Sequence, residues 1–138
     1  MTPRAVATAA LLVALAGCAP RWAGGDPCLC PAPMRETQLF FGLSRASGIA
    51  VSDAEWRAFL AEVVTPRFPR GLTVLDAEGQ YTPRAAADVR RERTRIVVLL
   101  HGGDHAADTA IDEIMRDYRR RFDQESVLRV DTAAAVSF

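Results

Sequence analysis

The sequence predicts an α+β domain of the ferredoxin-like type, with a four-stranded antiparallel sheet and two helices on one face. Three observations support this class. The five consecutive large aliphatic residues Ile96–Leu100 indicate a strand that is buried on both faces. Two segments with a helical period of apolar residues lie on either side of it, and the full order reads β-α-β-β-α-β. Right-handed crossovers then place both helices on one face and strands one and three in the middle.

The first strand and the first helix are predicted from residues 36–67. In residues 36–44, alternate positions on both sides of the chain are apolar or small, so this strand also needs cover on both faces. Ser52-Asp53-Ala54-Glu55 matches the S-x-x-E capping box that begins a helix. Pro66 and Pro69 are expected to end that helix. One apolar stripe faces the core, formed by Trp56, Phe59, Leu60, Val63 and Val64.

The second half of the domain contributes three strands and a helix. Residues 72–77 form a predicted strand, and Gly79–Arg91 is too long for a tight hairpin, which suggests a flap that carries Tyr81. The central strand covers Thr94–His101. A helix capped by Asp104 or Asp108 follows, with Arg119-Arg120-Arg121 in its last turn. Its apolar stripe is Ile111, Ile114, Met115, Tyr118 and Phe122, and residues 124–131 form the last strand, with Val136 and Phe138 packing beyond it.

Composition excludes one class of partner. The 138 residues carry 17 basic and 17 acidic side chains, so the chain has no net charge with which to attract nucleic acid. All 17 basic side chains are arginine, and asparagine is absent.

The amino terminus predicts a lipid-anchored envelope protein. Arg4 precedes a short apolar run that ends in Leu15-Ala16-Gly17-Cys18, so residues 1–17 have the form of a signal peptide. The L-A-G-C sequence resembles the bacterial lipoprotein lipobox. This resemblance implies lipidation of Cys18, cleavage before it, and an acyl chain such as palmitate on the new amino terminus. With Ala19 after the cysteine, we expect the outer membrane, facing the periplasm.

Residues 18–35 are expected to form a flexible tether rich in proline and glycine. Cys28-Leu29-Cys30 lies within it, and the two thiols are expected to form a disulfide in an oxidising envelope. A redox or metal-binding role is the alternative, although no third ligand lies nearby in sequence.

The folded domain, residues 36–138, resembles a known bacterial family. The motifs that carry the resemblance are E-T-x-L-F-F-G, S-x-x-E-W-x-x-F-L, R-I-V-V-L-L-H and Q-E-S-V-L-R-V. They are similar to the family called domain of unknown function 3574. The resemblance implies no activity, substrate or catalytic residue, so any function has to be argued from a site.

One cluster carries side chains that could bind a metal ion. His101, Asp104 and His105 lie between the central strand and the second helix and could supply three ligands to a divalent metal. The alternative is a polar loop in which the aspartate caps the helix and the histidines are exposed or locally bonded. No cofactor is otherwise predicted.

Several functions known for this fold class lack the residues they need. An acylphosphatase needs an asparagine, a copper chaperone needs a cysteine pair after strand one, and a nucleophile elbow needs G-x-S-x-G. RNA recognition needs aromatic residues on both central strands. Two hypotheses remain. The first is a non-enzymatic domain that binds a partner or small ligand on its helix-free face, with a homodimer as one form. The second is a small enzyme of the dimeric α+β barrel type, monooxygenase-like or metal-assisted, with His101 and Tyr81 at one pocket.

Overall fold

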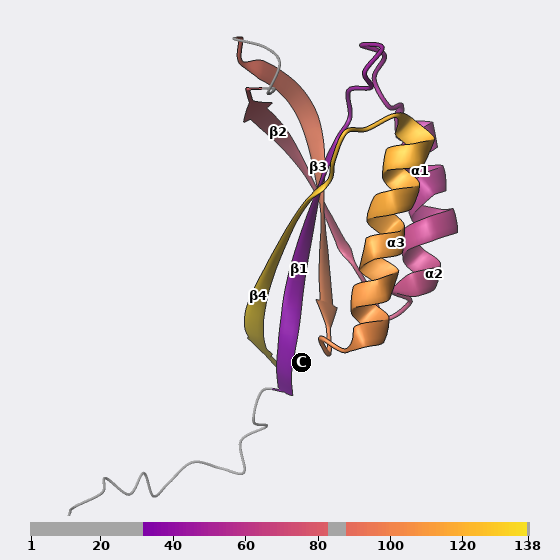
Figure 1. The fold of residues 1–138 in the computed structure, drawn as a ribbon. Coiled ribbons are helices and arrows are strands. Elements are labelled where there is room, and N and C mark those ends of the chain that lie inside the picture. The colour runs from indigo at the N-terminus through magenta and orange to yellow at the C-terminus, as the bar shows by residue number, and fades with distance from the viewer. Residues whose placement is uncertain (1–31, 83–87, 138) are drawn as a thin grey trace, which may run out of the picture.

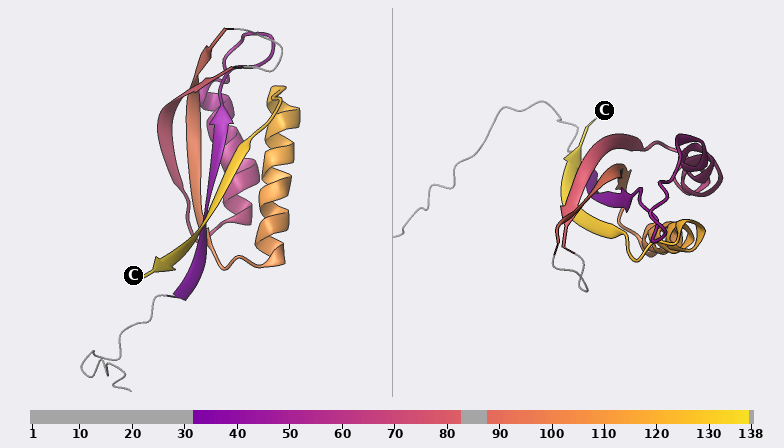
Figure 2. Two further views of the ribbon diagram at one scale, coloured as in Figure 1. Left: turned by 60° about the vertical axis from the view of Figure 1, so that its left-hand side comes forward. Right: turned by 90° about the horizontal axis from the view of Figure 1, so that it is seen from above.

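Two helical segments pack on one face of a twisted four-stranded sheet, and the other face carries no helix (Figures 1 and 2). The computed structural model describes residues 32–82 and 88–137. The strands are β1 (Ala32–Gly42), β2 (Thr73–Tyr81), β3 (Arg90–His101) and β4 (Leu128–Val136), in the spatial order β2-β3-β1-β4. All three neighbouring pairs are antiparallel. The predicted α+β fold, with the first and third strands in the middle, is confirmed.

The first helical segment begins as the capping box predicts. Ser52 accepts a hydrogen bond from the Glu55 backbone N–H, and the Glu55 carboxylate accepts one from the Ser52 N–H. Helix α1 (Asp53–Phe59) continues into a π-helical turn η1 (Leu60–Val64) and a last turn α2 (Thr65–Arg67). The helix therefore passes Pro66, where it was expected to end. Pro66 lies directly after the π-helical turn, a local widening of the helix that accompanies the proline.

Helix α3 (His105–Phe122) lies beside the first helical segment and completes the core. Asp104 is the N-cap of this helix, because its carboxylate accepts a hydrogen bond from the Ala107 N–H at 2.8 Å. Of the two caps that the sequence allowed, Asp104 and Asp108, the first is therefore the one used. Its last turn holds Arg119, Arg120 and Arg121, as predicted. Fully buried aromatic rings from β1 and both helices meet in edge-on contacts at the centre of the core, and they belong to Phe41, Trp56, Phe59, Tyr118 and Phe122.

The bounds of all four strands differ from the sequence-based expectation. β1 begins at Ala32. The last residues of the range that was expected to be a tether are therefore part of this strand, and they pair with the last residues of β4. β4 covers Leu128–Val136 and not residues 124–131. Both ends of the expected flap are strand, because Gly79–Tyr81 of β2 pairs with Arg90–Glu92 of β3, and residues 83–87 lie outside the described residues. Phe138 lies outside the described residues.

Within residues 32–82 and 88–137, no helix is both long enough and apolar enough to cross a membrane.

Candidate functional site

His101 is buried at the end of β3, and both of its ring nitrogens are engaged. The side chain lies on the helix side of the sheet and is 3% exposed. Its Nδ1 accepts a hydrogen bond from the Gly103 N–H at 3.1 Å. Because a backbone N–H can only donate, the proton of the neutral ring is assigned to Nε2, which donates to Thr37 Oγ1 at 2.8 Å. Neither nitrogen is left to coordinate a metal or to take a proton from a substrate.

A hydrogen-bonded chain links His101 to the surface. The Thr37 hydroxyl donates to Asp131 Oδ1 at 2.5 Å, and Arg129 Nε lies 2.9 Å from Asp131 Oδ2. The hydroxyl of Thr37 therefore accepts from the histidine and donates to the aspartate. Arg129 also contacts Asp108 of α3 at 2.5 Å, which in turn is 3.3 Å from Arg35 of β1. This network fills the end of the helix–sheet interface, where the aromatic core stops.

The network sets the protonation states of its members. Burial lowers the pKa of His101, and the nearby Arg35 guanidinium lowers it further, so the ring is held neutral. The hydrogen bond from Arg129 lowers the pKa of Asp108. Burial alone would raise the pKa of Asp131, but the hydrogen bonds from Thr37 and Arg129 outweigh it and lower the pKa. The arrangement stabilises a neutral histidine beside ionised carboxylates.

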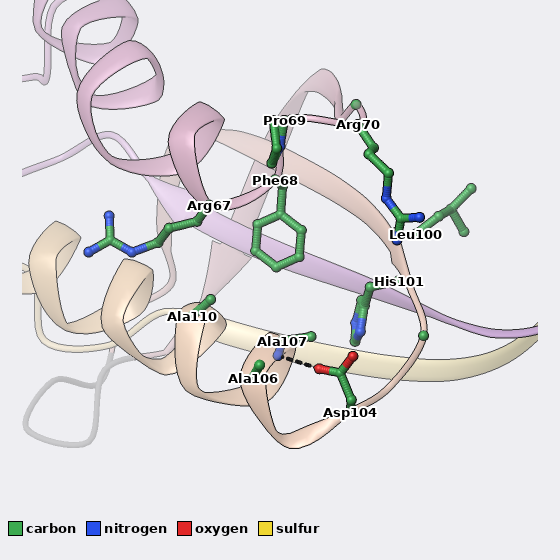
Figure 3. Close-up of a pocket in the computed structure, with 12 residues that line it drawn as sticks. Arg67, Phe68, Pro69, Arg70, Leu100, His101, Asp104, Ala106, Ala107 and Ala110 are labelled. Carbon is green, nitrogen blue, oxygen red and sulfur yellow. Dashed lines mark hydrogen bonds between the residues drawn. The ribbon is translucent and has the colours of Figure 1, made fainter.

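A pocket of about 370 Å³ adjoins the His101 ring (Figure 3). Its walls come from the segment after α2, the end of β3 and the first turns of α3. The Arg70 side chain extends toward Leu100 and His101, whereas Arg67 points away from the histidine and pairs with Glu113 and Asp117 of α3. The pocket is large enough for a small ligand, but its one titratable ring has no free nitrogen.

The three residues considered as metal ligands do not form a metal site. His101 has both nitrogens bonded, Asp104 caps α3, and His105 is exposed at the first position of that helix. Within residues 32–82 and 88–137, no three histidine, cysteine, aspartate or glutamate side chains are grouped as metal ligands. The loop matches the alternative in which the aspartate serves as a cap.

His101 and Tyr81 do not share a pocket. Tyr81 pairs with Arg90 at the first residue of β3, and His101 is the last residue of that strand. The two side chains also lie on opposite faces of the sheet. Arg90, the partner of Tyr81, is 11 residues before His101, and successive side chains of a strand alternate between faces. His101 therefore shares the helix side with the buried Val97 and Leu99, and Tyr81 lies on the other side. The expected pocket formed by both residues is therefore wrong.

The helix-free face carries the largest set of exposed apolar side chains in the described chain. Phe40 pairs with Ile96 and Leu128, and Gln38 with Val98 and Val130, so these rows share one face. The most exposed members are Leu128 at 59% and Leu75 at 49%. We define the apolar face as Phe40, Leu75, Ile96, Val98, Leu100, Leu128 and Val130. Both middle strands thus carry apolar side chains on both sides, as predicted, although β1 also places Glu36 and Gln38 on the helix-free face.

Sequence reasoning missed Thr37, Asp131, Arg35 and Arg129. Thr37 lies on the same side of β1 as Leu39, and a polar residue on a buried strand face is a signal that it has a partner. The partners themselves gave no signal, because His101 and Asp131 are 64 and 94 residues away along the chain. Cys18, Cys28 and Cys30 lie outside the described residues.

The fold and these sites define a ferredoxin-like α+β domain with one helix-covered and one exposed apolar sheet face. Residues 36–138 match the family described as Protein of unknown function (DUF3574), and the chain belongs to this family. No curated protein matches the sequence.

Two solved structures share the fold. A phage SAM lyase in complex with S-methyl-5'-thioadenosine is similar with a TM-score of 0.61 and 15% identity, over 76% of this chain and 84% of that chain. CutA from Synechococcus elongatus, complexed with a Bis-Tris molecule, is similar with a TM-score of 0.50 and 10% identity, over 80% of this chain and 88% of that chain. At these identities the likeness concerns the fold alone.

Proposed function

We propose that this protein is an envelope lipoprotein, anchored through Cys18, whose domain binds a partner through its apolar face and catalyses no reaction. The observation that carries the proposal is the exposure of Leu75 on one edge strand and of Leu128 and Val130 on the other. The half-buried side chains of Ile96, Val98 and Phe40 lie between them on the two middle strands. Contiguous exposed apolar surface on a soluble domain marks an interaction site, because leaving it in water is unfavourable. A binding domain uses this surface, whereas a reaction centre at His101 would need a free ring nitrogen.

The partner that the face suits best is a second copy of the same chain. At a strand spacing of about 4.8 Å, the paired residues of the whole sheet cover on the order of 600 Å² in projection, and all four strands lie side by side in three rows of it. With the relief of the side chains this approaches the roughly 800 Å² that each partner buries in a stable interface. The two of these rows that face away from the helices contain Gln38 and Thr73 as their polar members and no charged side chain, and Glu36 lies in the next row, between Leu100 and Thr132. Two such sheets can therefore stack these two rows without burying an unpaired charge when Glu36 lies at the rim of the interface.

Sedimentation of the full chain in a nonionic detergent tests the dimer. We expect a dimer for the wild type and a monomer for Leu128→Arg, because the variant would place a guanidinium against the apolar side chains of the partner sheet. Ile49→Arg is the matched control: Ile49 is 65% exposed in the loop before α1, away from the apolar face, and the variant should remain dimeric. A monomeric wild type, or equal masses for all three proteins, would reject the second copy as partner.

The anchor is tested separately by fractionation. Wild-type protein should sediment with outer membranes, and Cys18→Ala should be released or retained as an uncleaved precursor, because the lipid is attached to that sulfur. A Cys18→Ala protein that is processed and distributed like the wild type would reject lipidation.

The second candidate function is a small enzyme with its pocket at His101. The 370 Å³ pocket beside the ring favours it. The hydrogen bonds of His101 to Gly103 and Thr37 oppose it, because a general base must offer a free lone pair to its substrate. If the pocket binds a small molecule that perturbs the NMR resonances of His101 and Phe68, and Leu128→Arg leaves this binding unchanged, the enzyme hypothesis becomes the better one.

A further inference from the structure

A second hollow lies on the helix-free face, at the hairpin end of the sheet. It has a volume of about 390 Å³, within the range of small-ligand sites. Figure 1 shows that β2 and β3 bend away from the helices at this end. The hollow is lined by β1, the hairpin strands and the segment before β4. We call it the Glu92 hollow; its principal lining residues are Phe40, Gly42, Tyr81, Arg90, Glu92 and Leu128.

Two glycines form part of the lining of this hollow. A Cβ placed on Gly42 would lie 2.6 Å from Glu92 Oε1, and one on Gly79 would lie 2.6 Å from Thr94 Oγ1. Any other residue at either position would have to displace a polar side chain. Glycine in a strand interior weakens the strand, and it is typical of places where another group approaches the backbone closely. Here the groups that approach are the carboxylate of Glu92 and the hydroxyl of Thr94.

The Glu92 carboxylate has capacity for another donor. Its described hydrogen bond is a long one from the Ser44 N–H to Oε2, at 3.3 Å. An ionised carboxylate can accept about four hydrogen bonds. Glu92 is half-buried and lies over Gly42, so the carboxylate is held in the hollow and does not extend into solvent.

The charge of the hollow is predominantly negative. Among the described residues, the charged side chains that line it are those of Glu92, Asp123 and Glu125 and the guanidinium of Arg90. In residues 32–82 and 88–137, none of these four side chains forms an ion pair. The hollow therefore favours a positively charged ligand.

The remaining lining is apolar and aromatic. Phe40 and Leu128 are paired neighbours at one side, and the ring of Tyr81 is 41% exposed at the other. An exposed aromatic ring attracts a cation through its face, and the Phe40 and Leu128 side chains suit a hydrocarbon or planar group. A hollow of 390 Å³ that combines a carboxylate, an aromatic ring and an apolar wall suits a small ligand with one positively charged end and one apolar end.

We infer that the Glu92 hollow binds a small organic cation, with its ammonium or amidinium group at the Glu92 carboxylate and its apolar part against Phe40 and Leu128. This assigns a small-ligand site to the face on which the proposed function rests. Every residue used comes from one chain. Phe40 and Leu128 also belong to the apolar face, so a second copy stacked over them would compete with the ligand.

Calorimetric titration of the full chain in a nonionic detergent tests the site with two probes of the same shape. Benzamidine carries a positive charge next to a phenyl ring, and benzamide is its neutral counterpart. We expect saturable one-to-one binding of benzamidine, at least about tenfold tighter than benzamide, because only the amidinium forms a charge-assisted pair with Glu92. Glu92→Gln should weaken benzamidine binding by about tenfold or more and leave benzamide unaffected.

Glu78→Gln is the matched control. It removes the same charge from an exposed position of β2 that does not line the hollow, so benzamidine affinity should stay within about twofold of wild type. The inference is overturned if benzamidine shows no binding up to about 10 mM, or binds no better than benzamide. It is also overturned if Glu92→Gln binds benzamidine as the wild type does. Sedimentation of the same samples reports the dimer independently, so a failed dimer and a failed ligand site are distinguishable.

Discussion

Replacing Thr37 by valine keeps the shape of the side chain and removes the hydroxyl that joins His101 to Asp131. The wild-type hydroxyl accepts from His101 Nε2 and donates to Asp131 Oδ1. Thr37 is fully buried and His101 is 3% exposed, so water cannot replace the lost partner of the ring. The variant leaves the Nε2–H of a neutral, buried imidazole without an acceptor.

The expected loss of stability follows from that unsatisfied donor. Burying a polar group without its partner costs about 1–3 kcal/mol. Asp131 is partly exposed and keeps Arg129, so it contributes little to the loss. Thr37→Ser is the matched control, because it keeps the hydroxyl and removes one methyl group, at a cost of about 1 kcal/mol. We therefore expect Thr37→Val to unfold at lower urea than Thr37→Ser, although valine is the more hydrophobic residue.

Urea unfolding followed by circular dichroism and tryptophan fluorescence measures the difference, since Trp56 is buried in the core. A double-mutant cycle with His101→Leu should return a coupling free energy of about 1 kcal/mol or more, because removing both partners relieves the unsatisfied donor. If Thr37→Val is as stable as wild type, or more stable than Thr37→Ser, the hydrogen-bonded chain does not stabilise the fold and the reasoning is refuted.

Three further predictions concern single groups. Burial lowers the pKa of His101 in the folded protein, so the unfolded chain binds the proton of this ring more readily. The contribution of the neutral ring to the free energy of unfolding should be fully present above about pH 6.5 and should decline as the pH falls toward the folded pKa. Urea unfolding measured at several pH values should find this decline reduced in His101→Gln. Ser52→Ala should lower the free energy of unfolding by about 1 kcal/mol. It should also raise the pKa of Glu55 from about 2 part of the way toward its ordinary value. The backbone N–H of residue 52, which lowers this pKa most, remains, and the hydrogen bond from the Ser52 hydroxyl is lost. Carbon-detected NMR titration of the carboxyl group can follow this change. Tyr118→Phe removes the donor to the Gly42 carbonyl oxygen, 2.8 Å away, and should lower the melting temperature by an amount equivalent to about 1 kcal/mol; an unchanged melting temperature would show that this hydrogen bond adds nothing.

Local patterns in the sequence predicted the elements, and long-range pairing decided where they end. The aliphatic run at Ile96–Leu100 and the Ser52 capping box each act within a few residues, so the strand and the helix start were predictable. The start of β1 was not, because Ala32 and Pro33 have weak strand preference and belong to the sheet only through pairing with β4. The charged Arg90 and Arg91 likewise extend β3 because β2 lies opposite them.

The candidate sites also fall into one that a local sequence pattern predicted and one that depends on contacts between distant residues. The exposed apolar face followed from alternation on two strands, which is a local pattern. The environment of His101 did not, because Thr37 and Asp131 come from β1 and β4 and meet the ring only in the folded sheet. Their contacts also explain why the metal hypothesis failed: the histidine that seemed free in sequence already has two hydrogen-bond partners.

The position of β1 constrains when this domain can fold. The earliest strand of the domain lies between β3 and β4, and Ala32 is aligned with Val136 of the final strand. During synthesis or export, β1 therefore waits for nearly the whole domain to emerge before both of its edges can pair, which is a high-contact-order route and slows folding. A chain truncated after α3 would lack β4, so β1 would become an edge strand. Its unpaired backbone N–H and C=O groups would then be exposed next to apolar side chains on both faces of the strand. Truncation before β4 (Leu128–Val136) should thus produce aggregation and not a smaller stable domain.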